Sequence, residues 1–264
     1  MKSGSLSLRA ISIRSLATLL VTMSTTATAG VLPTVWDGWT QIANDDGVGA
    51  GGYVNPGWGG QAFDAEYLYS KQVGSVLYLG LQTGFNVASG KVTVDGKSYY
   101  AGDLALSFDN DPSHYEYAVD FGLYTEDYDG NKVDAGSNTG IDGPGLYTDV
   151  AWDDQIYFAQ SSPFAMDVGT YVEGLLANAS GSGTVGGDLS YYRIVAFDMT
   201  GLGLGSVFDV HWTMSCGNDA IFAHDPLNVP EPGTMSLFGA GLLGLVLLRR
   251  RARPAPSRVR ASHS

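Results

Sequence analysis

Short segments of alternating polar and apolar residues fill the middle of the chain, and they constrain its fold more than any other feature. In residues 207–215, for example, Phe208, Val210, Trp212 and Met214 fall on one face, and the residues between them fall on the other. Clusters of Gly, Asp and Asn separate such segments, as expected for turns. This pattern predicts β-strands that each bury one face in a hydrophobic core.

The alternating segments are numerous enough for a two-layer fold. The ranges that we predict as strands are 36–42, 62–69, 75–84, 91–99, 103–108, 115–123, 146–152, 165–173, 191–198 and 207–215. The best helical candidate is a turn or two near residues 173–179, and the Gly-rich segments 44–60 and 127–145 are predicted to be long surface loops. Because crossover helices are missing, the pattern predicts an all-β fold, a single antiparallel β-sandwich of about ten strands.

The charges divide the chain into an acidic body and two basic ends. The 264 residues carry a net charge of −13, but nine of the 14 Lys and Arg residues lie in the first 29 and the last 16 residues. Residues 30–229 keep five basic residues against 26 carboxylates, a balance of 5 − 26 = −21. Such a body lacks the basic face that nucleic acids require, and it suits divalent cations or a hydrated matrix. The single cysteine, Cys216, excludes an intrachain disulfide.

The N-terminus has the pattern of a secretory signal peptide. Basic residues precede an apolar run at 16–23, and small residues follow, with Ala27 and Ala29 placed for recognition by signal peptidase. We therefore predict a signal helix within residues 1–29, cleavage between Ala29 and Gly30, and a mature domain at 30–228. The alternative is an uncleaved anchoring helix, but the run is shorter than the roughly 20 apolar residues that span a bilayer.

The C-terminus combines three features in a fixed order. It begins with Val229, Pro230, Glu231 and Pro232, continues with a short apolar stretch at 235–248, and then reaches Arg249, Arg250 and Arg251. The apolar stretch predicts a thin membrane helix, with the acidic body outside and the basic tail 252–264 in the cytoplasm.

In this order, residues 229–251 resemble the PEP-CTERM sorting signal of Gram-negative bacteria. The resemblance implies export through the inner membrane and recognition by a membrane-embedded exosortase that cuts near Pro230–Pro232. It also implies transient anchoring, a final place at the cell surface or outside the cell, and an association with exopolysaccharide or biofilm. An ordinary C-terminal anchor is the alternative, and the tail after Arg251 is longer than usual for the signal. Whether the helix is retained or removed stays open.

The body also bears a loose resemblance to exported lectin-like or DOMON-type sandwiches, some of which bind carbohydrate. The residues that carry it are Tyr67-Leu68-Tyr69, Leu77-Tyr78-Leu79, Gly102-Asp103-Leu104, Tyr115 to Asp120, and Trp212 to Asp219. Such families share no single ligand, so the resemblance implies a lectin-like or jelly-roll fold and little about function.

Alternating oxygen side chains in the second Gly-rich loop favour a calcium site. Asp127, Asp129, Asn131 and Asp134 provide them, but Lys132 stands where an EF-hand needs Gly. The loop also carries Asn138 where an EF-hand has a bidentate Glu. Further acidic clusters are Asp109 with Asp111, and Asp45 with Asp46. The alternative is a set of solvated acidic loops, and the scattered His residues do not have zinc-ligand spacing.

Trp58 is the one tryptophan that the sequence places in a loop, because Gly57, Gly59 and Gly60 surround it. We interpret it as a platform for a sugar ring, whereas the other aromatic residues suit a sandwich core. No catalytic residues are assigned, since Cys216 and His211 would face opposite sides of a strand. We therefore expect a structural or adhesive protein associated with exopolysaccharide. A calcium-dependent carbohydrate-binding module is the alternative, and an exported polysaccharide hydrolase a further one.

Overall fold

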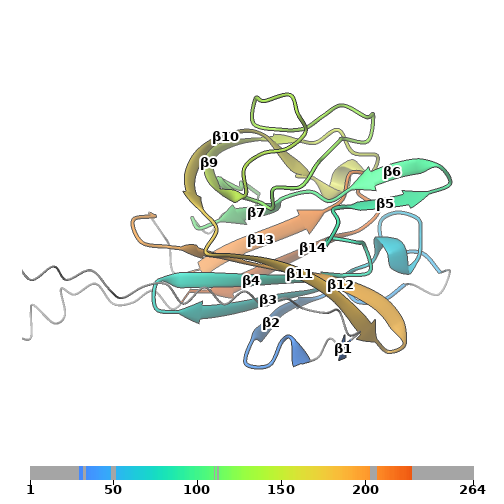
Figure 1. Cartoon of the computed structure of the whole chain (residues 1–264), viewed down its shortest axis with the longest axis horizontal. Coiled ribbons are helices and arrows are strands. Elements are labelled where there is room, and N and C mark those ends of the chain that lie inside the picture. Colours follow the sequence, from blue (N-terminus) through green and yellow to red (C-terminus); the bar gives the residue numbers. More distant parts are fainter. Residues whose placement is uncertain are drawn as a thin grey trace, which may run out of the picture.

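Two six-stranded β-sheets face each other and form one sandwich, as the computed structural model shows (Figure 1). The structure describes residues 30–31, 34–48, 52–109, 111, 113–202 and 207–227. The first sheet has the order β1 (Gly30–Val31), β11 (Ala177–Val185), β12 (Asp188–Asp198), β4 (Val76–Thr83), β3 (Ala65–Val73) and β2 (Thr40–Asn44). The predicted signal helix, membrane helix and basic tail lie outside the described residues.

The second sheet supplies the other layer. Its order is β10 (Ala165–Gly174), β9 (Gly145–Asp153), β8 (Tyr117–Asp120), β7 (Leu104–Ser107), β13 (Val207–Thr213) and β14 (Ala220–Pro226). A separate hairpin, β5 (Lys91–Val94) and β6 (Lys97–Tyr100), projects from one end, and the 3-10 helices η2 (Gln61–Phe63) and η3 (Ala159–Ser161) lie in loops. The strand pairs within each sheet are antiparallel except β1 with β11, so the all-β antiparallel sandwich is confirmed.

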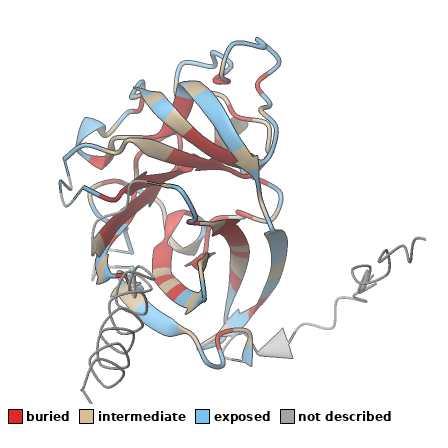
Figure 2. Ribbon diagram, turned by 90° about the vertical axis from the view of Figure 1, so that its left-hand side faces the viewer, coloured by how far each residue is buried: buried red, intermediate tan, exposed pale blue. Residues whose placement is uncertain are grey.

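The core lies between the facing sides of the sheets, where buried residues concentrate (Figure 2). Leu77, Leu79 and Leu81 project into it from β4, as their alternation with Val76, Tyr78 and Gly80 predicts. From the second sheet, β13 and the residue after it contribute four fully buried side chains to the same core: Phe208, Val210, Trp212 and Met214. After β14, Leu227 also packs into this core.

Three local predictions are wrong. Residues 36–42 do not form a strand throughout, because residues 35–38 lie in turns and β2 begins only at Thr40. Residues 173–179 do not form a helical turn, because the chain crosses between the sheets there and Ala177–Val185 forms β11. This strand consists mainly of small and polar residues, so its sequence shows no apolar alternation. Residues 91–99 do not form one strand, because Asp95 and Gly96 adopt positive φ angles of 50° and 80° and close a two-residue hairpin.

The second face of β13 is buried rather than exposed to solvent as its polarity predicts. The imidazole Nε2 of His211 lies 3.0 Å from the carbonyl oxygen of Ser161 and 3.1 Å from that of Pro163, because the η3 segment covers this face. Burial lowers the pKa of His211 to about 4, so the ring is neutral at physiological pH. In the described part of the chain, no helix is long and hydrophobic enough to cross a bilayer.

Candidate functional site

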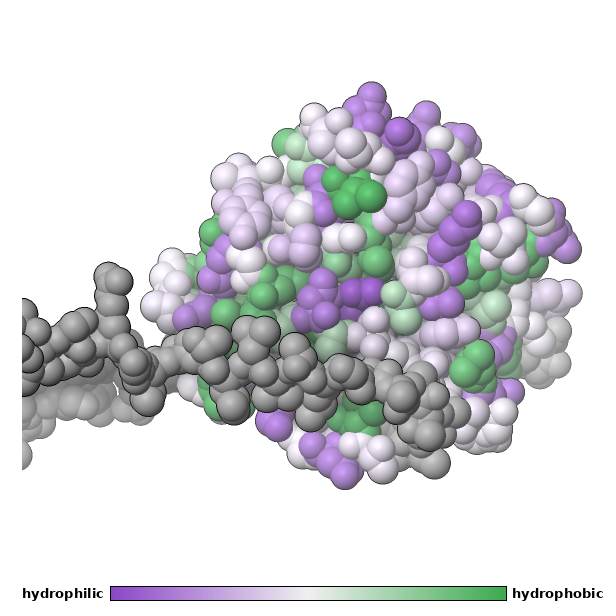
Figure 3. Space-filling view, in the orientation of Figure 1, coloured by the Kyte–Doolittle hydropathy of each residue, from purple (hydrophilic) through white to green (hydrophobic). Residues whose placement is uncertain are grey.

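Aromatic residues from distant segments line a pocket of about 360 Å³ at the end of the sandwich that carries the β5–β6 hairpin (Figure 1). The residues that line this aromatic pocket are Trp58, Gly59, Phe63, Val94, Asp95, Tyr99, Tyr128, Tyr157, Cys216 and Asn218. On the face seen in Figure 3, hydrophobic residues form separate clusters among hydrophilic ones. The aromatic side chains among the lining residues are those of Trp58, Phe63, Tyr99, Tyr128 and Tyr157.

Trp58 and Tyr157 form the most exposed part of the aromatic pocket. Their side chains are 61% and 53% exposed, and their ring centroids lie 6.1 Å apart. The Tyr128 ring lies 5.2 Å from that of Tyr157 and extends the aromatic surface. An aromatic ring that is open to solvent does not contribute to the core. It presents a flat apolar face on which the C–H face of a sugar ring can stack.

The backbone beneath Trp58 is held firmly although its ring is exposed. The Gly57 amide donates a hydrogen bond of 2.7 Å to the Asn218 carbonyl oxygen, and the Asn218 side-chain amide donates to the Trp58 carbonyl oxygen. A Cβ atom on Gly57 would lie 2.5 Å from the Asn218 Cα, so only glycine allows this close approach. Gly57, one of the glycines that mark a loop in the sequence, thus serves to dock it.

Polar groups and one cysteine thiol lie beside the aromatic rings of the pocket. The Lys97 ammonium lies 3.1 Å from the Tyr128 ring centroid and fixes that ring by a cation–π contact. Asp95 and Asn218 offer hydrogen-bonding groups next to the rings. Burial raises the pKa of Cys216 to about 12, so its thiol stays protonated and is a poor nucleophile.

The loop predicted to bind calcium uses two of its carboxylates to organise its own backbone. Asp127 accepts hydrogen bonds of 2.8 and 2.7 Å from the backbone and side-chain amides of Asn131, whereas Asp129 is exposed. Asp134 accepts from three backbone amides between residues 136 and 140. Burial alone would raise the pKa of Asp134, but hydrogen bonds from Gly140, Asn138 and Ser137 outweigh it and lower the pKa to about 2. Calcium binding by this loop stays a prediction.

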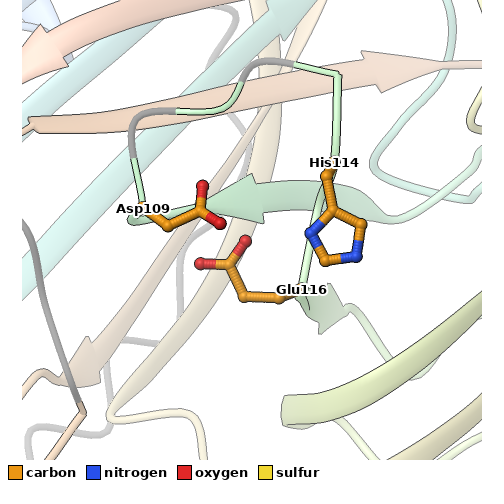
Figure 4. A group of neighbouring side chains, drawn as sticks. All are labelled: Asp109, His114 and Glu116. Atoms are coloured by element: carbon orange, nitrogen blue, oxygen red, sulfur yellow. The ribbon is translucent and has the colours of Figure 1, made fainter.

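Asp109 and Asp111, predicted as a pair, point to different partners. Asp111 accepts hydrogen bonds from the amide and hydroxyl of Ser113, whereas Asp109 lies with His114 and Glu116 (Figure 4). The potential ligand atoms of these three residues lie within 4.8 Å of one another. The sequence signal for them is the alternation of His114 and Glu116 on the segment that enters β8. Because Asp109 and His114 are exposed, water competes for any ion at this group.

Comparison with known proteins identifies one segment of the chain. Residues 228–251 match the family model of the PEP-CTERM protein-sorting motif. No curated protein and no solved structure matches the chain, so the lectin-like resemblance stays a prediction. The matched segment contains the residues predicted for the sorting motif: Val229, Pro230, Glu231, Pro232 and Arg249–Arg251. These residues lie outside the described part of the chain, and so do the predicted signal-cleavage residues Ala27 and Ala29. Gly30 begins β1.

Proposed function

Because this chain carries a PEP-CTERM sorting motif and is therefore an exported protein targeted to exosortase, we propose that it acts as a structural or adhesive component of the cell surface or extracellular matrix. Its partner in this role is exopolysaccharide, which it binds through the aromatic pocket around Trp58. The observation that carries the proposal is the pair of exposed rings, Trp58 and Tyr157, on a backbone fixed by Gly57 and Asn218. A rigid aromatic surface binds a sugar ring without a large loss of conformational entropy.

The composition of the pocket favours binding over hydrolysis. Glycoside hydrolysis uses two carboxyl groups on either side of the scissile bond, about 5–10 Å apart. Asp95 is the one carboxylate among the residues that line the aromatic pocket. We therefore propose a binding protein that lacks catalytic activity. If the protein were instead a hydrolase, its incubation with the polysaccharide would release new reducing ends.

Substitution of the exposed rings tests the proposal. In affinity electrophoresis of the exported protein through gels that contain the native exopolysaccharide, Trp58→Ala and Tyr157→Ala should each weaken binding about tenfold. This corresponds to about 1.4 kcal/mol for the loss of one stacking surface. Phe222→Ala is the matched control, because the Phe222 ring is 71% exposed but does not line the aromatic pocket. Equal mobility of all three variants and the parent protein would contradict the proposal.

Sorting is tested separately, through the mass of the surface form. Replacement of Pro230, Glu231 and Pro232 by Ala should leave the C-terminal segment attached, because the exosortase would lose its recognition element. Intact-mass analysis of the native surface protein reports this cleavage and that of the signal peptide together. An unchanged mature mass in the triple variant would show that another enzyme or signal directs processing.

A further inference from the structure

A second group of carboxylates lies near the two ends of the loop that contains Trp58. Asp46 follows β2, Asp64 follows η2, and Glu66 lies in β3. One potential ligand atom from each of the three lies within 4.8 Å of the other two. Two oxygens bound to one Ca²⁺ at 2.3–2.6 Å lie at most about 5 Å apart, so this spacing fits a shared cation.

Asp64 is the most unusual member of this group. Its side chain is 1% exposed, and neither carboxylate oxygen has a hydrogen-bond partner of good geometry in the described part of the chain, although the Gly47 amide interacts with the carboxylate and partly lowers its pKa. The other buried carboxylates each have at least one hydrogen-bonded oxygen: Asp103, for instance, accepts a hydrogen bond of 2.9 Å from the Met166 amide. A buried ionised carboxylate without a partner costs several kcal/mol, so a native protein is expected to compensate it.

Glu66 is oriented toward the same point by neutral donors. Its Oε1 atom accepts hydrogen bonds from the Gln61 amide at 2.7 Å and the Ser190 hydroxyl at 2.6 Å, and its Oε2 atom accepts from the Gln82 amide at 2.6 Å. The Trp36 indole N–H in turn donates to Gln82 at 2.7 Å. Such a shell fixes the direction of a carboxylate without neutralising it, as outer-shell groups do around metal ligands.

The charge of the group is not balanced by basic side chains. Asp45 and Asp219 lie next to it, and Asp219 accepts a hydrogen bond of 2.8 Å from the Ala65 amide. Within the described ranges, the one close contact between a basic and an acidic side chain joins His224 and Asp209, 2.8 Å apart in the other sheet. Burial and the charge of Glu66 raise the pKa of Asp64 to about 7, which reflects how unfavourable its ionised form is without a counterion.

We propose that Asp46, Asp64 and Glu66 bind a divalent cation of the calcium class. The donor set consists of oxygen atoms without His or Cys, which suits a hard cation rather than zinc. Both oxygens of Asp64 are available for bidentate binding, and Asp46 lies in a loop, which suits the flexible geometry of Ca²⁺. The ion would join the two ends of the loop between β2 and η2. The proposal concerns the cation alone and holds whether or not the aromatic pocket binds polysaccharide.

Calcium binding to the exported protein tests the site directly. After removal of ions with EDTA at pH 7.5, calorimetric titration with CaCl2 should show binding at one site that Asp64→Asn weakens more than tenfold. At a free Ca²⁺ concentration of 100 times Kd, the melting temperature of the parent protein should rise by about 5–10 °C, because such saturation stabilises the native state by about 2.7 kcal/mol. Asp46→Asn, at the exposed rim, should also lose this response and provides a second variant if Asp64→Asn folds poorly.

The control variants separate this site from the other acidic clusters. Asp129→Asn and Asp109→Asn alter exposed carboxylates outside the group and should retain the parent Kd. Terbium luminescence adds a local readout, because the Tyr67 hydroxyl donates a hydrogen bond to Asp46 and its ring can sensitise a bound ion. The proposal is overturned if the parent protein shows no heat, luminescence or thermal shift with these ions. It is also overturned if Asp129→Asn abolishes binding while Asp64→Asn preserves it.

Discussion

Replacement of Arg193 should destabilise the sandwich more than that of any other basic residue in the body. Arg193 is the one arginine in residues 30–229, it lies in β12, and its side chain is 5% exposed. Its Nε and Nη2 atoms donate hydrogen bonds of 3.0 and 3.1 Å to the carbonyl oxygens of Val87 and Ala88, and Nη1 donates to the Asn178 side chain at 2.6 Å. The guanidinium also lies 5.0 Å from the Phe121 ring centroid. One side chain thus fastens the β4–β5 loop and β11 to the sheet.

The expected loss for Arg193→Met follows from these contacts. Methionine keeps much of the apolar stem but leaves the buried Val87 carbonyl and the half-buried Ala88 carbonyl without donors, at about 1–3 kcal/mol each. Asn178 is exposed and regains a hydrogen bond from water, while removal of a desolvated charge offsets part of the loss. We expect a net loss of about 3 kcal/mol, which lowers the melting temperature by about 6–12 °C in a domain of this size.

Urea and thermal denaturation of Arg193→Met, Arg193→Lys and the exposed control Lys71→Met measure these differences at pH 7. Arg193→Lys should lose less, because it keeps the charge and one donor. Burial lowers the pKa of Arg193 to about 10, and the charge of the neighbouring Asp120 partly opposes this shift. The guanidinium is therefore charged at pH 7, where it stabilises the ionised form of Asp120. The deficit of Arg193→Met should therefore grow from pH 6 to pH 8. The reasoning is refuted if Arg193→Met stays within 1 kcal/mol of the parent protein.

Three further results are expected. In EDTA, the free energy of unfolding should fall between pH 6.5 and 8.5, because burial raises the pKa of Asp120 to about 7 and that of Asp103 well above its usual range. The folded state then binds protons that the unfolded state has already released, and it loses this advantage as pH rises; urea midpoints that increase with pH would contradict this. Cys216 should not react with a thiol reagent in the native protein but should react fully in guanidinium, since it is buried with a pKa raised to about 12; rapid native labelling would contradict its burial. Gly80→Ala should cost about 1–3 kcal/mol and shift the Trp fluorescence to longer wavelength, because the new Cβ would lie 2.3 Å from the Trp36 ring; an unchanged spectrum would show that the ring adjusts without cost.

The sequence predicts the strands whose apolar residues alternate, and it misses those that lack this pattern. β4 and β13 follow directly from their Leu and aromatic residues. β11 could not be found in this way, because the small side chains of Ala177–Val185 do not alternate in hydrophobicity and the strand is specified by pairing with β12. The Asp95-Gly96 hairpin, in contrast, carried a usable turn signal within the alternating run.

The candidate sites show the same division between local and long-range information. The exposure of Trp58 follows from its glycine neighbours, but Tyr128 and Tyr157 reach it only through the folding of distant loops. Asp64 and Glu66 resemble ordinary polar positions in the sequence. Their burial depends on the β2–η2 loop and on distant side chains such as Trp36, in the turn before β2, and Ser190, in β12. A pattern read along one strand contains no information about such covering segments.

The end of β14 sets the length of the tether between the folded body and the sorting motif. β14 ends at Pro226, Leu227 is packed in the core, and the matched motif begins at residue 228. Three Cα–Cα steps of 3.8 Å separate Leu227 from Pro230, so these residues lie at most about 11 Å apart. Pro232 lies five such steps from Leu227, at most about 19 Å away, so an enzyme that recognises Pro230–Pro232 must work within about two nanometres of the sandwich. The shape and charge of the surface near the end of β14 thus become part of what the enzyme must accommodate, as they would not on a long flexible stalk.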